Sequence, residues 1–309
     1  MLPDLSELGA LTQRYAAVTA ALELESGEQP LVLPNGEWFP DKFQADLESV
    51  ERLLCRMQGY AGLEATEITL SLAGLGSDGA SCSSGKASSC GSCAAPTPGS
   101  NEVGLERNAS GYVIRLPASF VSHPIGLTST LARLLGGIRF IESGAAEADA
   151  EQAELSAVAL GFGVLLLEGS YIYAKSCGGP SVGKLTAMGC GELSWAFSLF
   201  LATEGHAPGP AKKELSTTQR AFFDEAWGLV SSSSNKKLVE RLKDDPEKAA
   251  RSKLQVAPAR SWLAGVLGFG GSKKPADPEA LALEALERGD DVDGIAALLA
   301  NAPAAGAAE

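Results

Sequence analysis

The stretch that decides the fold is residues 127–170, whose sequence is LTSTLARLLGGIRFIESGAAEADAEQAELSAVALGFGVLLLEGS. Large apolar residues recur in its first part at spacings of three and four, which is the pattern of one face of an α-helix. They are Leu127, Leu131, Leu134, Leu135, Ile138 and Ile141. A second helix is predicted from about Ala148 to Gly169, on an apolar stripe made by Leu155, Val158, Phe162, Leu165 and Leu166. We therefore expect two packed helices at the centre of the molecule.

Glycines interrupt both predicted helices. Gly136 and Gly137 lie in the first helix, and Gly161 and Gly163 lie in the second. A glycine in a helix interior costs about 1 kcal/mol relative to alanine, so we expect a packing reason, namely a close approach of the two backbones. The apolar run at 157–167 is shorter than the roughly 20 residues that span a bilayer. We interpret it as part of a buried core helix.

The rest of the chain predicts an α+β fold that is mainly helical and has a small β-sheet. Further helices are expected at residues 5–24, 41–60, 192–203 and 217–230. Phe43 is expected on the inward face of the second of these. Alternating apolar residues predict two strands, at 67–72 and 112–116, the second preceded by a hairpin turn at 108–111. Residues 175–183 are expected to form a loop.

The composition predicts a compact domain with an appendage at its C-terminal side. The domain is expected at residues 1–230, interrupted by a Gly/Ser/Cys-rich insertion at 74–100. A linker with an apolar island is expected at 231–276, a helical hairpin at 277–301 and a disordered tail at 302–309. Apolar patches that stay exposed often mark interaction sites. The candidate partner-binding residues of the island are Trp262, Leu267 and Phe269.

The charge balance argues against two classes of partner. The 309-residue chain has a formal net charge of −13, which disfavours binding to nucleic acids and to anionic membrane surfaces. The first residues include Asp4 and Glu7 and no apolar run, so no secretory signal is visible. We therefore expect a cytoplasmic protein whose six cysteines are reduced.

Four short motifs follow one another in a set order. They are VLPNGEWFP at 32–40, the helical stretch VERLLCRM at 50–57, the strand and turn YVIRLP at 112–117, and GFGV at 161–164. This order resembles a bacterial group of zincin-like metallopeptidases, and the resemblance covers residues 30–205. It implies a zincin-like α+β scaffold. An unrelated α+β domain with ordinary core helices is the alternative.

The resemblance also locates where a catalytic zinc site would lie. Members of the family carry His-Glu-x-x-His on the helix before the GFGV-type step, where two histidines bind zinc and the glutamate acts as general base. The matching positions here are Arg133, Leu134 and Gly137, and a downstream acidic ligand would fall near Glu154. The resemblance therefore implies a degenerate site with no catalytic residues, no metal and no cofactor. We expect Arg133 to pair with Glu154 across the two helices.

Other residues suggest sites less strongly. Cys82, Cys90 and Cys93 include a Cys-Gly-Ser-Cys, for which metal binding, redox chemistry and a mobile loop all remain open. Residues 178–184 resemble a phosphate-binding loop, but Leu185 stands where Ser or Thr is required. The two histidines of the chain, His123 and His206, are expected at the surface.

Three functions are compatible with these patterns. The leading hypothesis is a non-catalytic metallopeptidase-like protein that acts by binding another protein. The first alternative is a hydrolase that keeps activity with an atypical site. The second is a structural subunit of a larger assembly, built through the C-terminal segment.

Overall fold

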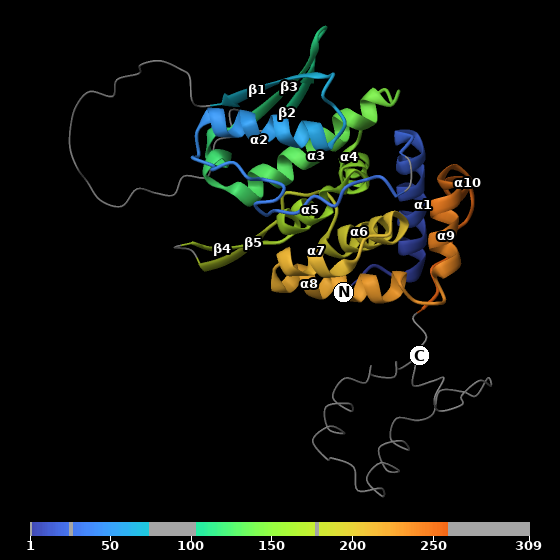
Figure 1. The fold of residues 1–309 in the computed structure, drawn as a ribbon. Helices are drawn as coiled ribbons and strands as arrows, with labels where there is room; N and C mark the ends of the chain where they lie inside the picture. Colours follow the sequence, from blue (N-terminus) through green and yellow to red (C-terminus); the bar gives the residue numbers. More distant parts are fainter. Residues whose placement is uncertain (1, 25–26, 74–102, 177–178, 259–309) are drawn as a thin grey trace, which may run out of the picture. The chain divides into compact units, whose positions relative to one another are not determined.

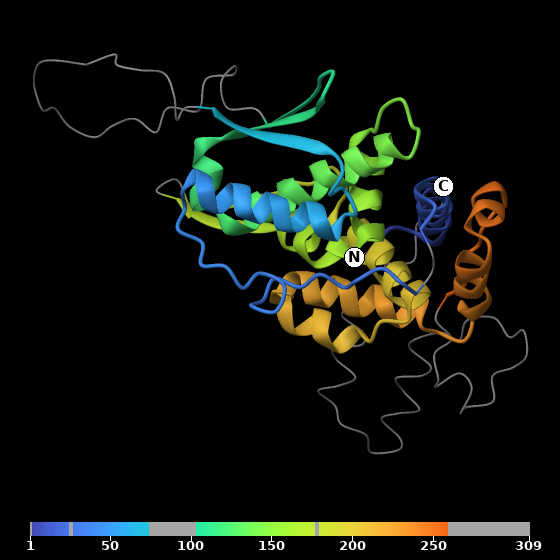
Figure 2. The same ribbon diagram turned by 45° about the horizontal axis from the view of Figure 1, so that its top comes forward.

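The computed structural model describes residues 2–24, 27–73, 103–176 and 179–258. These residues form a mainly helical unit with a small three-stranded sheet, which confirms the expected α+β class (Figure 1). The sheet covers one side of α2 (Leu47–Tyr60) and α3 (Pro124–Glu142), and the helices α6 (Cys190–Glu204) and α8 (Thr217–Val230) lie on their other side (Figure 2). The insertion at 74–100 lies outside the described residues.

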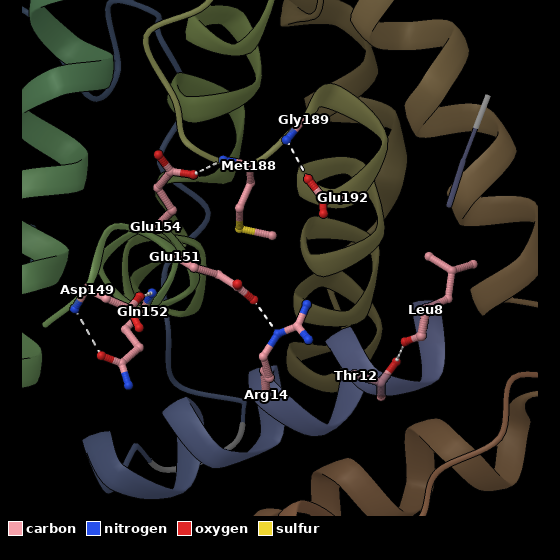
Figure 3. Close-up of polar contacts among 10 residues, drawn as sticks. All are labelled: Leu8, Thr12, Arg14, Asp149, Glu151, Gln152, Glu154, Met188, Gly189 and Glu192. Atoms are coloured by element: carbon pink, nitrogen blue, oxygen red, sulfur yellow. Dashed lines mark hydrogen bonds and ion pairs between the residues drawn. The ribbon is translucent and has the colours of Figure 1, made fainter. Parts of the chain in front are cut away.

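The two central helices are present as expected, and the second is kinked. It consists of α4 (Ala150–Ala157), a π-helical turn η2 (Val158–Phe162) and α5 (Gly163–Ser170). Asp149 caps its start, because the side chain accepts the Gln152 N–H at 2.7 Å while the Gln152 side chain accepts the Asp149 N–H at 3.0 Å (Figure 3). Among the described helices, Ala150–Ser170 alone is long and apolar enough to cross a membrane, and 94% of its apolar window is buried in the protein. This burial matches the core helix that the sequence predicts.

Two of the glycines show why the helices need them. A Cβ added at Gly136 would lie 2.3 Å from the carbonyl oxygen of Ala153 and 2.6 Å from the nitrogen of Ala157, so α3 and α4 touch backbone to backbone. Gly161 has a φ of 91°, which produces the kink, and a Cβ there would lie 1.8 Å from the carbonyl oxygen of Pro30. The expected close approach of the two helix backbones is therefore confirmed at Gly136, whereas Gly161 and Gly163 of the second helix lie against Pro30 and the Phe197 ring instead.

The sheet has the order β1-β3-β2 and is mixed. β1 (Glu67–Ala73) runs parallel to β3 (Gly111–Pro117), and β2 (Gly104–Arg107) runs antiparallel to it. Asn108 closes the β2–β3 hairpin by donating its N–H to the Gly111 carbonyl at 2.9 Å, as the sequence predicts. The inward residues of β1 and β3 pair directly: Ile68 with Tyr112, Leu70 with Ile114 and Leu72 with Leu116.

The remaining helices close the core around α6, whose side chains are almost all buried. The indole N–H of Trp195 on α6 donates to the Thr12 hydroxyl at 2.9 Å, which fixes α6 against α1 (Leu5–Leu22). Further elements are the 3-10 turn η1 (Ala118–Ser122), α7 (Pro208–Glu214), α9 (Lys236–Asp244) and α10 (Pro246–Arg251).

The compact unit does not end near Val230, as the sequence predicted, but continues to Pro258, the last described residue. α9 and α10 pack against α6 and α1, and the Gln13 side chain donates to the Ala250 carbonyl at 2.6 Å. The apolar residues of these two helices and of the segment that follows them join the same core: Leu238, Leu242, Ala249, Leu254 and Val256. The first part of the expected linker is therefore core. The rest of the linker, the expected hairpin at 277–301 and the tail at 302–309 lie outside the described residues.

Two further expectations are corrected. The helix expected at 41–60 begins only at Leu47, because Ala45 has a φ of 55° and the Asp46 side chain caps the helix by accepting the Ser49 N–H at 2.8 Å. Phe43 therefore precedes the helix and is 38% exposed rather than inward. The expected loop at 175–183 is part of an antiparallel hairpin of β4 (Ile172–Ser176) and β5 (Gly179–Gly183), so its last residues form a strand and no phosphate loop.

Candidate functional site

Three of the four positions that the resemblance assigns to a zinc site lie on α3, and the fourth, Glu154, lies on α4. A Cβ added at Gly137 would contact the Ala153 Cβ at 3.3 Å, immediately beside Glu154 on α4. Leu134 is half-buried and packs against the core. Arg133 is also half-buried, with its Nε atom inside the protein. A guanidinium, an alkyl side chain and a hydrogen offer no lone pair to a metal, so these residues do not fit zinc.

Glu154 is completely buried and holds a loop in place. Its two carboxylate oxygens accept the N–H groups of Ala187 at 2.6 Å and Met188 at 2.9 Å, the second of which is drawn in Figure 3. These residues immediately precede α6, whose Gly189 N–H is accepted by the Glu192 side chain at 2.6 Å. Glu154 therefore fixes the position at which α6 begins.

Arg133 does not form the expected direct pair with Glu154. The carboxylate oxygens of Glu154 receive backbone N–H groups instead, and the buried Nε atom of Arg133 has no hydrogen-bond partner among the described residues. Burial raises the pKa of the Glu154 carboxyl above its ordinary value. The N–H groups of Met188 and Ala187, and then the charges of Arg133 and Lys184, act in the opposite direction but do not cancel it.

Glu154→Gln should change how stability depends on pH. Because the folded-state pKa of Glu154 is raised, the folded protein holds this proton more tightly than the unfolded chain. The free energy of unfolding of the wild type therefore falls as pH rises from the pKa of Glu154 in the unfolded chain, about 4.3, through its higher pKa in the folded protein. Glutamine does not titrate, and its NH₂ group replaces one of the two side-chain oxygens that accept a backbone N–H. The lost hydrogen bond lowers the free energy of unfolding by about 1 kcal/mol.

Urea unfolding of both proteins between acid and neutral pH measures this effect. We expect the free energy of unfolding of the wild type to exceed that of the variant most at acid pH, and we expect this difference to become smaller as pH rises. A difference that widens with pH would mean that the N–H groups and Arg133 lower the pKa of Glu154.

Of the other site residues proposed from the sequence, only some lie in the described part of the chain. Within the described ranges, no group of three or more His, Cys, Asp or Glu side chains could hold a metal ion. His123 is exposed, as expected, whereas His206 is half-buried, and its Nε2 lies 2.8 Å from the Gln29 carbonyl oxygen. Two groups of candidates lie outside the described residues, and their roles stay predictions: Cys82, Cys90 and Cys93, and Trp262, Leu267 and Phe269.

A cavity of about 640 Å³ between α1 and the start of α6 has its charged side chains already engaged. Glu7 accepts the Asp4 N–H, Arg14 pairs with Glu151 (Figure 3), and Glu192 accepts the Gly189 N–H. Burial raises the pKa of the Cys190 thiol in its wall, so this thiol is held in its protonated, weakly nucleophilic form. We see no free reactive group here.

A second candidate surface lies at the first turn of α3. A cavity of about 370 Å³ is bounded by the loop before α2, by α2 and by α3. Its apolar walls include Phe39, Phe43, Leu53 and Leu127, and its charged walls are Asp41, Lys42, Arg52 and Arg56. A second cavity, of about 430 Å³, shares Pro124 and is lined mainly by Phe120, Ile125, Ile172 and Leu185. We call these two cavities together the Pro124 surface.

Exposed apolar side chains concentrate at the Pro124 surface. The described residues leave four large apolar side chains exposed: Phe43 at 38%, Leu5 at 39%, Leu47 at 44% and Ile125 at 50%. Phe43 and Ile125 line the two cavities, and Leu47 begins α2, which lines the first of them. Sequence reasoning missed this surface because it assigned Phe43 to the core. The Asp46 N-cap, which leaves Phe43 outside the helix, was the signal that could have found it.

No protein-family model, curated protein or solved structure matches this chain. The function must therefore be inferred from the residues themselves, and the Pro124 surface is distinguished by the exposed apolar side chains of Phe43 and Ile125 in its walls.

Proposed function

We propose that this protein is a non-catalytic relative of the zincin-like metallopeptidases that binds a partner protein through the Pro124 surface. The observation that carries the proposal is the concentration of exposed apolar side chains around two cavities that share Pro124. Soluble proteins rarely leave such side chains grouped together unless another molecule covers them.

The positions that match the zinc site support the non-catalytic half of this proposal. Arg133 places a cation and Gly137 places a helix contact where the family has histidines, and Leu134 supplies no base. Each carboxylate oxygen of Glu154 accepts one backbone N–H group, so this side chain has a structural role in the loop before α6. A general base must lie within reach of its substrate, and Glu154 is buried away from solvent.

Replacing Phe43 and Ile125 together by serine should weaken partner binding by about tenfold or more, since apolar anchors at the centre of an interface contribute most of its affinity. The partner is first purified from the native host with the wild-type protein, and its affinity for each variant is then measured by calorimetry. Leu5→Ser is the matched control, because Leu5 is equally exposed and lines neither cavity.

Thermal unfolding should be nearly unchanged in both variants, because the replaced side chains are already partly in water. If the double variant and the Leu5→Ser control bound the partner with equal affinity, the Pro124 surface would not be the binding site. Cleavage of a peptide panel that depends on added zinc would reject the non-catalytic assignment.

A further inference from the structure

The walls of the Pro124 surface are more cationic than the protein as a whole. The chain carries a net charge of −13, yet the charged side chains in the walls of the first cavity are Lys42, Arg52 and Arg56 against the single carboxylate of Asp41. The local charge is therefore opposite in sign to that of the whole molecule. Such a contrast selects a partner by charge and guides its approach.

Not all of this positive charge is free to act on a partner. Arg56 donates to the Asp41 carboxylate at 2.6 and 2.9 Å, and Arg52 donates to Glu48 and to the Ser49 hydroxyl. Within the described ranges Lys42 takes part in no ion pair and is exposed. It is the cation of this cavity that is available to a partner.

The start of α3 adds partial positive charge at the same place. No side chain caps the N-terminus of this 19-residue helix, and its first turn contains no acidic residue. Uncapped N–H groups and the helix dipole both favour a negative group nearby. Pro124, the first residue of the helix, lines both cavities, so this effect coincides with the Lys42 charge and with the apolar walls.

We propose that the partner segment is acidic and amphipathic, with apolar side chains in the cavities beside Phe43 and Ile125 and carboxylates directed toward Lys42 and the first turn of α3. This inference rests on the proposed function, because it names the chemistry of the partner at the same surface. A basic or uncharged apolar segment would fill the same cavities but would not use Lys42.

A random-peptide display library selected on the full-length protein tests the proposal. Peptides that bind the wild type but not the Phe43→Ser, Ile125→Ser double variant are sequenced, and the most frequent ones are synthesised. We expect them to combine Asp or Glu with large apolar residues. Lys42→Glu should weaken their binding by about tenfold, and raising NaCl from about 0.05 M to about 0.5 M should weaken it further for the wild type.

Lys213→Glu is the matched control, because Lys213 is also exposed, forms no ion pair in the described part of the chain, and lines neither cavity. It should leave the affinity within about twofold of the wild type. The proposal that the partner segment is acidic would be overturned if the peptides that depend on the Pro124 surface were neutral or basic, or if the two lysine variants had equal effects on binding. The proposed function would remain in either case. Failure to select any surface-dependent peptide would overturn both.

Discussion

Gly136→Ala should destabilise the protein by about 3 kcal/mol or more, even though alanine is the better helix former. The added methyl would lie 2.3 Å from the Ala153 carbonyl oxygen and 2.8 Å from the Ala157 Cβ. The first of these is backbone, which cannot rotate away as a long side chain could. α3 and α4 would have to separate, and their contact holds the centre of the core.

Gly228→Ala provides the control. Gly228 lies inside α8, is exposed, and has no atom within 4 Å of an added Cβ. The free energy of unfolding of that variant should rise by about 1 kcal/mol, because alanine has the higher helix propensity. Guanidinium unfolding of the two variants and the wild type measures both effects. If Gly136→Ala were as stable as Gly228→Ala, the two central helices could not be in backbone contact.

Gly161→Ala should prevent stable folding altogether. Two penalties coincide at this residue: its φ of 91° is rarely adopted by other residues, and its Cβ would lie 1.8 Å from the Pro30 carbonyl oxygen. The Val32 N–H also donates to the Gly161 carbonyl at 3.1 Å, so a shift of either segment breaks this bond. Displacement of residues 30–33 would in turn move Pro34, which lines the Pro124 surface.

Gly144→Ala separates the two penalties. Gly144 has a φ of 104° but open space around its Cβ position, so its replacement should cost about 1–2 kcal/mol from backbone strain alone. The comparison uses the soluble yield, the circular dichroism spectrum and the unfolding midpoint. Equal costs at the two positions would mean that the segment at 30–33 does not lie against the kink.

The sequence was sufficient for those parts of the fold that local periodicity encodes. The leucines of α3 and the alternation at 67–72 each repeat often enough to define a buried face. The glycines pointed correctly to close packing, but the sequence could not say that Gly161 lies against Pro30, because that contact joins segments about 130 residues apart. Loop residues of this kind carry no periodic signal.

Other parts of the fold and the site were not predicted from the sequence, for identifiable physical reasons. α9 and α10 are short and rich in charge, so the sequence predicted a linker there, whereas contact with α6 and α1 buries Leu238, Leu242 and Ala249. The start of α2 depends on the Asp46 cap, which the sequence could have indicated, and on the positive φ of Ala45, which no sequence pattern indicates. The Pro124 surface combines residues near 40, 52, 124 and 172, and no local pattern brings these segments together.

The packing of α1 has a consequence for synthesis on the ribosome. Translation makes α1 before the segments against which it packs: the Thr12 hydroxyl accepts from the Trp195 indole, and Gly9 packs against the Leu254 carbonyl, 245 residues further along the chain. At about 5–20 residues per second, these 245 residues correspond to about 12–50 s of translation. During that time α3, α4 and α6 become available to α1, but the side of α1 at Gly9 and Gln13, which packs against Leu254 and Ala250, has no native partner. The nascent chain is therefore expected to recruit chaperones through this side of α1 until α10 and the segment after it emerge.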